Sequence, residues 1–149
     1  MIVLQEIDQS NYKQCAQLKT KASQGHFVAP NWYSLLEANY ESNRKPFAIS
    51  SEGDIIGFIM YSYYQADSSY PVDSWWIERF MIDQDQQGKG YGKEGILAGV
   101  NWFKQTMDET ELRISAEVTN EVAIRLYQKQ GFSLTGEEVE GEKVLLLKW

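Results

Sequence analysis

The chain has 149 residues and a formal net charge of −7, and 43% of its residues are hydrophobic. This length and composition indicate one folded domain, residues 1–149, with its own core. The acidic charge would repel nucleic acid and anionic membranes, so we expect neither as a partner; a cationic ligand and plain solubility explain it equally well. Cys15 is the only cysteine and His26 the only histidine, which excludes an internal disulfide, argues against a metal site and predicts a cytoplasmic protein.

Hydrophobic spacing in the first half of the chain predicts two helices and three strands. Tyr12, Cys15 and Leu18 fall on one face of the first helix. The second helix is expected from Trp32 to about Glu41, again with its apolar residues on one side. Strands are expected at residues 2–4, 47–49 and 55–64, the last two joined by a turn signal at residues 51–54.

The second half of the chain predicts a buried strand, two helices and three further strands. Residues 75–82 are apolar on both faces, as expected for a strand that is covered on both sides. In the next helix, Ile96, Val100, Phe103 and Met107 share one face. The remaining elements are a strand at residues 112–118, a helix that Asn120 caps and Gly131 stops, and strands near residues 132–134 and 144–149. The whole pattern predicts an α/β (α+β) fold built in layers.

Three glycines alternate with two other residues in the stretch Gln86-Gln87-Gly88-Lys89-Gly90-Tyr91-Gly92-Lys93. Glycine permits a positive φ and the close approach of a ligand, and the N–H groups at the start of the next helix attract phosphate. The stretch therefore predicts a phosphate-bearing cofactor. No nucleoside-triphosphate loop occurs, and the dinucleotide fingerprint at Gly90, Gly92 and Gly95 begins seven residues too late after the strand. A plain glycine-rich turn is the remaining alternative.

The string Gln87-Gly88-Lys89-Gly90-Tyr91-Gly92 resembles the [RQ]-x-x-G-x-[GA] segment of the GNAT acyltransferase family. A second block, from Asn120 through Tyr127 to Phe132, and the hairpin at residues 52–57 are similar to other segments of that family, in the same order. The resemblance implies a mixed, mostly antiparallel sheet of six to seven strands with about four helices. It also implies that acetyl-CoA binds where two neighbouring strands splay apart. Within the family, the chain looks closest to bacterial spermine/spermidine acetyltransferases.

The resemblance also implies which residues bind the cofactor. Backbone groups of Phe80, Met81 and Ile82 would hold the pantetheine arm, and Asn120 would touch that arm or a water beside it. The pyrophosphate would lie against the residues of the loop and the start of the helix, which are Gln87, Gly88, Lys89, Gly90, Tyr91, Gly92 and Lys93. Many family members carry Arg at the position of Gln87, so this chain lacks one positive charge there.

Glu78 is the candidate general base for the reaction. A primary amine with a pKa of roughly 10.4 must lose a proton before it attacks a thioester, at a cost of about 4–5 kcal/mol at neutral pH. The two-residue period of a strand places Glu78 on one face with Trp76, Phe80 and Ile82, and places Arg79 on the other face. Apolar surroundings of this kind would raise the pKa of the carboxyl group. The position is also similar to that of a catalytic glutamate of the polyamine-acetylating members, and the alternatives are a structural ion pair and a surface-facing strand end.

Tyr127 is the candidate general acid, because it matches the tyrosine with which the family protonates the departing thiolate. Transfer from a phenol of pKa about 10 to a thiol of pKa about 8.5 is uphill by roughly 2 kcal/mol. The step therefore requires that the proton move as charge develops, or that the site lower the pKa of the phenol. A core tyrosine on an apolar helical stripe is the alternative.

We expect the acceptor to be a small amine, with Glu78, Trp32 and Trp76 as candidate contacts through charge and aromatic faces. Further candidates are Tyr33, Glu37, Glu41 and Glu117. A polyamine is the favoured acceptor. The alternatives are another amine (an amino acid, an antibiotic or a protein N-terminus) and a non-catalytic CoA-binding regulatory domain. A homodimer is conceivable through the apolar strand at residues 145–147.

Overall fold

The computed structural model describes residues 1–149, which form seven strands, four helices and two short 3-10 turns. The strands are β1 (Ile2–Glu6), β2 (Arg44–Ser51), β3 (Asp54–Tyr64), β4 (Ser74–Ile82), β5 (Glu111–Glu117), β6 (Ser133–Val139) and β7 (Glu142–Lys148). The helices are α1 (Tyr12–Gln17), α2 (Asn31–Tyr40), α3 (Tyr91–Thr106) and α4 (Glu121–Lys129), and the turns are η1 (Ala22–Gln24) and η2 (Gln84–Gln86). All predicted elements are found, with small shifts at their ends.

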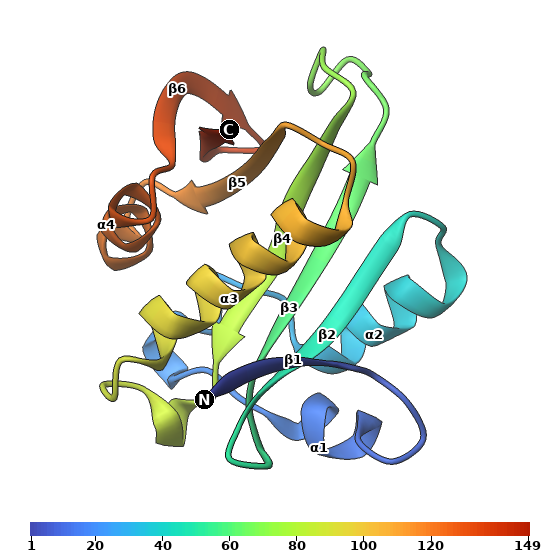
Figure 1. Ribbon diagram of the computed structural model, residues 1–149. Helices are drawn as coiled ribbons and strands as arrows, with labels where there is room; N and C mark the ends of the chain where they lie inside the picture. Colours follow the sequence, from blue (N-terminus) through green and yellow to red (C-terminus); the bar gives the residue numbers. More distant parts are fainter.

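All seven strands belong to one sheet in the order β1-β2-β3-β4-β5-β7-β6 (Figure 1). Every neighbouring pair is antiparallel except β4 and β5, which run parallel. The predicted mixed, mostly antiparallel sheet with about four helices is thus confirmed. No helix is long and apolar enough to cross a membrane.

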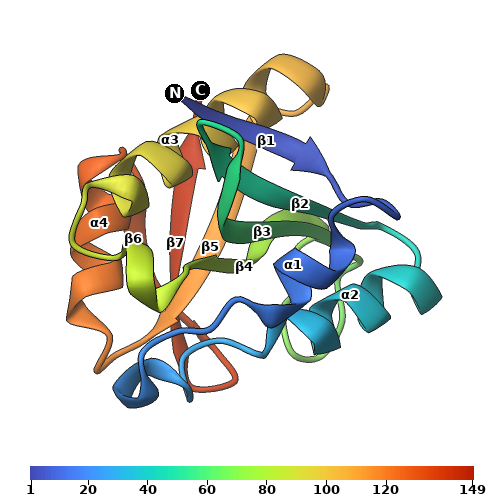
Figure 2. The same ribbon diagram turned by 90° about the horizontal axis from the view of Figure 1, so that it is seen from below.

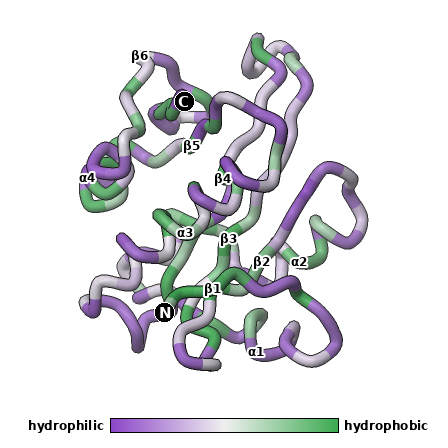
Figure 3. The backbone as a smooth tube through the Cα atoms, in the orientation of Figure 1, coloured by the Kyte–Doolittle hydropathy of each residue, from purple (hydrophilic) through white to green (hydrophobic).

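The helices cover both faces of this sheet, as Figure 2 shows. On one face, α3 and α4 bury the larger core, which includes Ile96, Val100 and Phe103 of α3. On the other face, Cys15 of α1 and Leu35 of α2 pack on a smaller cluster around β3. The helices alternate between hydrophobic and hydrophilic residues along the chain (Figure 3), because each lies on the sheet with one side and faces solvent with the other.

The predicted dimer strand lies inside the sheet. β7 pairs with β5 along one edge and with β6 along the other, and Leu145 and Leu147 are buried in the larger core. This strand therefore has no free edge with which a second copy of the chain could pair, and the homodimer stays a prediction from the sequence.

A bulge in the β3–β4 ladder changes which side chains of β4 share a face. Tyr61 pairs with Ile77 and Met60 pairs with Arg79, so Glu78 is an extra residue between the two pairs. A bulge of this kind breaks the two-residue alternation and re-aims the side chains that follow it. The expectation that Glu78 shares a face with Phe80 is therefore wrong.

After the bulge, Phe80 and Ile82 pack in the core below α3, together with Trp75 and Ile77. Met81 packs instead with the α1–α2 cluster. Arg79 reaches Glu37 of α2 on that same face. Glu78 and Arg79 thus lie on one face, contrary to the sequence prediction.

The parallel strands β4 and β5 separate directly after they meet. Only Trp76 with Arg113 and Ile77 with Ile114 are paired, and the arrowheads of β4 and β5 point apart in Figure 1. From Arg79 to Ile82, β4 is paired with β3 alone. The backbone of its last residues therefore faces an opening in the sheet, at the place where the bulge begins.

Candidate active site

A cavity of about 1130 Å³ occupies the opening between β4 and β5. This exceeds the upper end of roughly 1,000 Å³ that is usual for small-molecule pockets, which suits two substrates that meet. Its walls come from the ends of β4 and β5, the loop before α2, the loop between β3 and β4, the start of α4 and the β6–β7 turn. The structure contains no group of three side chains that could hold a metal ion.

The glycine loop forms one end of this cavity and leads into α3. Gly88 and Gly90 have φ values of 79° and 85°, a region that side chains other than glycine rarely occupy. A Cβ atom at either position would meet no atom within 4 Å. Gly90 is the N-cap of α3 and offers no side-chain cap, so the first N–H groups of this helix have no partner within the helix. The loop is thus an open concave surface of backbone donors, which suits a phosphate group.

The residues predicted to bind the cofactor fall into two groups. Seven of them line the cavity, namely Phe80, Met81, Ile82, Gln87, Gly88, Gly92 and Asn120. The other four, Lys89, Gly90, Tyr91 and Lys93, are not among the lining residues, although all of them belong to the loop or the first turn of α3.

The side chain of Gln87 connects three parts of this site. Its Nε2 donates to the carbonyl of Ile82 at 3.0 Å and to Oε1 of Gln24 at 3.0 Å. The first bond ties the glycine loop to the end of β4, and the second ties it to η1 in the loop before α2. Gln87 therefore holds the two walls of the cavity together, a role that the sequence pattern did not reveal.

Glu78 lies in a network of charges rather than in apolar surroundings. Its Oε2 accepts from the hydroxyl of Ser62 and pairs with Arg44, while its Oε1 accepts from the hydroxyl of Tyr64 and pairs with Arg79 at 3.3 Å. The side chain is 15% exposed and still lines the cavity. The apolar environment expected from the strand period is not found, because the bulge places Phe80 and Ile82 on the other face of the sheet and brings Arg79 beside Glu78.

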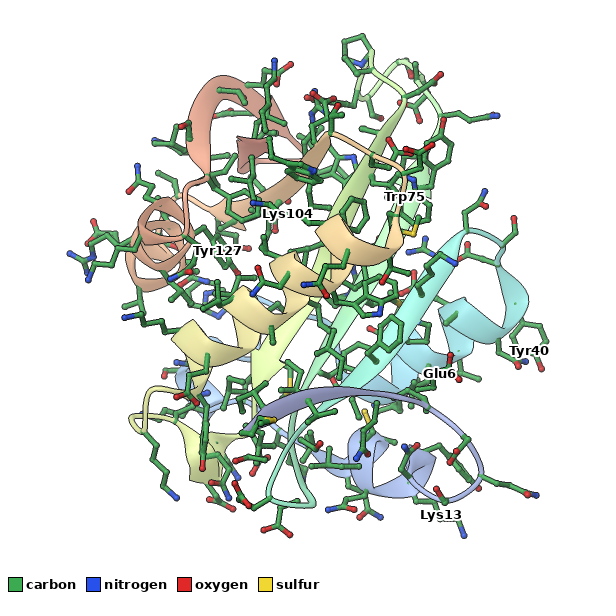
Figure 4. All side chains as sticks on the ribbon, in the orientation of Figure 1. Glu6, Lys13, Tyr40, Trp75, Lys104 and Tyr127 are labelled. Atoms are coloured by element: carbon green, nitrogen blue, oxygen red, sulfur yellow. The ribbon has the colours of Figure 1, made fainter.

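Tyr127 extends from α4 toward the sheet (Figure 4) and lines the cavity. The residue is 7% exposed, and its hydroxyl has no hydrogen-bond partner in the protein. Burial, with a smaller contribution from the nearby carboxylate of Glu142, raises the pKa of Tyr127. The site thus does not lower the pKa of this phenol, so it stays protonated and is available as a hydrogen-bond donor.

The structure places Asn120 at the N-cap of α4, which confirms the cap predicted from the sequence. Its side chain accepts from the N–H of Ala123 at 3.3 Å, which is the usual bond of an N-cap. The residue also lines the cavity. Capping fixes the direction of α4, and this direction points Tyr127 at the cavity.

The two tryptophans predicted to contact the acceptor lie in different places. Trp76 lines the cavity and packs edge-on against Tyr70 of the β3–β4 loop. Trp32 is 54% exposed on α2 and is not among the lining residues. The loop just before α2, residues 23–30, forms that wall instead, and no local sequence pattern marks it as a binding segment.

Sequence reasoning missed a second carboxylate close to Tyr127. Glu142, the first residue of β7, lines the cavity and accepts from the hydroxyl of Ser115 at 2.7 Å. Ser115 lies on β5 two residues before Glu117, which is the cross-strand partner of Glu142. Only the register of β5 and β7 brings these side chains together, so no motif in the sequence signals them.

The sequence is similar to those of known acetyltransferases. The acetyltransferase (GNAT) family model matches residues 8–132. Spermine/spermidine N(1)-acetyltransferase of Bacillus subtilis (strain 168) is 36% identical over 104 residues, which are 68% of this chain and 68% of that protein. A probable spermine N(1)-acetyltransferase of Bacillus subtilis subsp. natto (strain BEST195) matches with the same identity and coverage.

Solved structures share the fold at low sequence identity. Aminoglycoside acetyltransferase AAC(6')-Ib in complex with coenzyme A superposes with a TM-score of 0.81 at 16% identity, over 99% of this chain and 95% of that one. Spermidine N-acetyltransferase from Vibrio cholerae, in complex with CoA and spermine, superposes with a TM-score of 0.70 at 15% identity, over 97% of this chain and 92% of that one. The fold, the family match and the relatives agree, and the chain belongs to the GNAT acetyltransferase family.

Proposed function

We propose that residues 1–149 act as one N-acetyltransferase domain that transfers an acetyl group from acetyl-CoA to a primary amine of a polyamine such as spermine or spermidine. The observation that carries this proposal is the cavity between β4 and β5, which is lined both by residues of the glycine loop and by carboxylates that include Glu78 and Glu142. The names of the Bacillus subtilis relatives support the choice of acceptor. A cytoplasmic location stays a prediction from the sequence.

The residues at the cradle end suit coenzyme A. Open space at Gly88 and the free N–H groups of the first turn of α3 fit a pyrophosphate. The unpaired edge of β4 from Phe80 to Met81 offers backbone groups to an amide-bearing arm, while the carbonyl of Ile82 already accepts from Gln87. When bound, acetyl-CoA would supply an activated thioester carbonyl, and these residues would orient it.

Tyr127 is the proposed acid. Because the pKa of Tyr127 is raised, full transfer of its proton to a thiolate is more strongly uphill than for a free phenol. The hydroxyl would therefore act as a hydrogen-bond donor to the sulfur and release its proton only as negative charge develops there. We expect Tyr127→Phe to lower kcat by about 100-fold or more while CoA affinity changes less than twofold. Unchanged turnover would remove Tyr127 from this role.

Glu78 is the proposed base, as the sequence predicts, and the network around it sets a condition on that role. Its two oxygens already accept from the hydroxyls of Ser62 and Tyr64 and pair with Arg44 and Arg79, so a proton from the amine must reach it through a water or after one of these neighbours has moved. If Glu78 takes this proton, the rate ratio of Glu78→Gln to the parent protein should fall as the pH is lowered. A ratio that stays constant with pH would contradict the role.

The acceptor is tested by thiol release from acetyl-CoA with spermine, spermidine, lysine and an aminoglycoside. We expect release with the two polyamines at the lowest acceptor concentrations. Release with the aminoglycoside or lysine alone would favour another amine as substrate. Binding of CoA without release for any amine would identify a non-catalytic CoA-binding domain.

A further inference from the structure

Glu142 differs from Glu78, the other half-buried carboxylate that lines the cavity, because it has no arginine partner. Glu37, Glu78 and Glu111 each pair with an arginine. Glu142 accepts only from the hydroxyl of Ser115. A carboxylate that is partly removed from water without a positive partner is unfavourable, so Glu142 is suited to receive a cation from a ligand.

The register of the sheet makes the lack of a cation at Glu142 still less favourable. Glu142 lies directly opposite Glu117 in the β5–β7 ladder, and like charges in that position are destabilising. The single ion-pair contact of either glutamate is with His26, whose Nε2 lies 3.8 Å from Oε2 of Glu117 and whose side chain is 61% exposed. No lysine or arginine forms an ion pair with either glutamate.

A second observation points to a ligand at the same place. Tyr127 is more than nine-tenths buried, lines the cavity beside Glu142 and has no partner for its hydroxyl. Leu112, Ile114 and Ala116 of β5 pack in the core below α3 and α4, so Ser115 points to the opposite face by the two-residue period. The unpartnered hydroxyl and the unpaired carboxylate thus converge on one cavity from two faces of the sheet.

We infer that Glu142, held in place by Ser115, binds a second, non-reacting ammonium group of the acceptor while the reacting nitrogen lies near Tyr127. This inference rests on the proposed function and makes it more specific. It defines the substrate class as amines that carry another positive charge along the chain, that is, diamines and polyamines. A monoamine of similar length would react without this contact.

The chemistry of a two-ended amine explains why the two nitrogens need different surroundings. The nitrogen that attacks must be neutral, whereas the distant one keeps its proton and its charge at neutral pH. The carboxylate that serves the reacting nitrogen must remove a proton from it, whereas a carboxylate at the distant nitrogen has only to hold a charge that stays in place. Binding there also neutralises the charge that helps to raise the pKa of Tyr127.

The test compares Glu142→Gln with the parent protein by steady-state thiol release, using spermidine and butylamine as acceptors. We expect KM for spermidine to rise roughly ten- to hundredfold, as for the loss of a hydrogen bond to a charged group. KM for butylamine and KM for acetyl-CoA should change less than twofold. Glu142→Asp should recover part of the spermidine affinity, and Ser115→Ala should lose less than Glu142→Gln.

Glu138→Gln is the matched control, because Glu138 lies in the same hairpin, is exposed and does not line the cavity. Its KM values should equal those of the parent protein. An equal rise of KM for spermidine and butylamine in Glu142→Gln, or no rise for either, would overturn the inference and leave the proposed function intact. If the parent protein releases thiol with neither amine, the proposed function fails and the inference fails with it.

Discussion

The charge network around Glu78 makes a quantitative prediction for Glu78→Gln. The substitution keeps the shape of the side chain but removes its charge, and it turns one of two accepting oxygens into a donating amide group. That amide would face either the hydroxyl of Ser62 and Arg44 or the hydroxyl of Tyr64 and Arg79. The hydroxyls of Ser62 and Tyr64 donate to Glu78 and accept from Arg44, so the new amide would find an acceptor only if one of these hydroxyls turned around.

The expected loss of stability depends on which carboxylates remain beside Arg44 and Arg79 after the substitution. Removing one member of a buried ion pair costs about 3–5 kcal/mol. Glu37 pairs with both arginines and Glu41 pairs with Arg44, so two carboxylates still balance the two guanidinium groups. We therefore expect the lower end, about 3 kcal/mol. For a domain of this size, that loss corresponds to a decrease in Tm of roughly 6–12 °C.

The assay is urea and thermal unfolding followed by far-UV circular dichroism, with Glu41→Gln as the matched control. Glu41 is 54% exposed and contacts Arg44 alone at 2.9 Å, so its loss should cost less than about 1 kcal/mol. A Glu78→Gln protein whose Tm lies within about 2 °C of the parent would refute the reasoning. It would mean that the network contributes nothing to stability and that Glu78 is held there for another reason.

Three further predictions test the cofactor end, the buried thiol and the β3–β4 contact. Gly92 lines the cavity at the start of α3 without a positive φ, and a Cβ there would lie 3.7 Å from Leu126. In calorimetry, Gly92→Ala should therefore bind CoA normally, whereas Gly92→Val should bind it about tenfold or more weakly. Equal affinities of the two variants would remove this turn from the cofactor site. Burial raises the pKa of Cys15 to about 12. A thiol-specific disulfide reagent at pH 8 should therefore modify this thiol only after the protein unfolds. Rapid labelling of the native protein would contradict the burial of Cys15. A Cβ at Gly57 would lie 2.6 Å from the backbone carbonyl of Met81. Gly57→Ala should therefore lower the free energy of unfolding in urea by about 1–3 kcal/mol. An unchanged urea midpoint would show that β3 can move away from β4.

Local patterns in the sequence were sufficient to predict the elements and the open glycine loop. The glycine loop, its position between a strand and a helix, and the cap at Asn120 depend on residues that are close together in the chain. The conformational preference of glycine and the hydrogen bond of an N-cap act within one turn of backbone. For this reason the residue types alone predicted the open loop before α3 and the start of α4.

The surroundings of Glu78 could not be predicted in the same way. Strict alternation along residues 75–82 placed Arg79 on the opposite face, and the prediction failed at the bulge between Met60 and Tyr61. A bulge depends on the pairing of two strands and has no sure sign in either strand alone. The same is true of Glu142, which reaches Ser115 only through the register of β5 and β7.

The sequence by itself determined the family, the order of helices and strands, and the loop that suits a pyrophosphate, because periodicity and backbone preference are local properties of the chain. Only the tertiary structure decided which charged groups surround Glu78, that β7 has no free edge, and that Glu142 meets Tyr127 in one cavity. Those outcomes depend on strand order and register, which are set when distant segments pair and bury their apolar faces together.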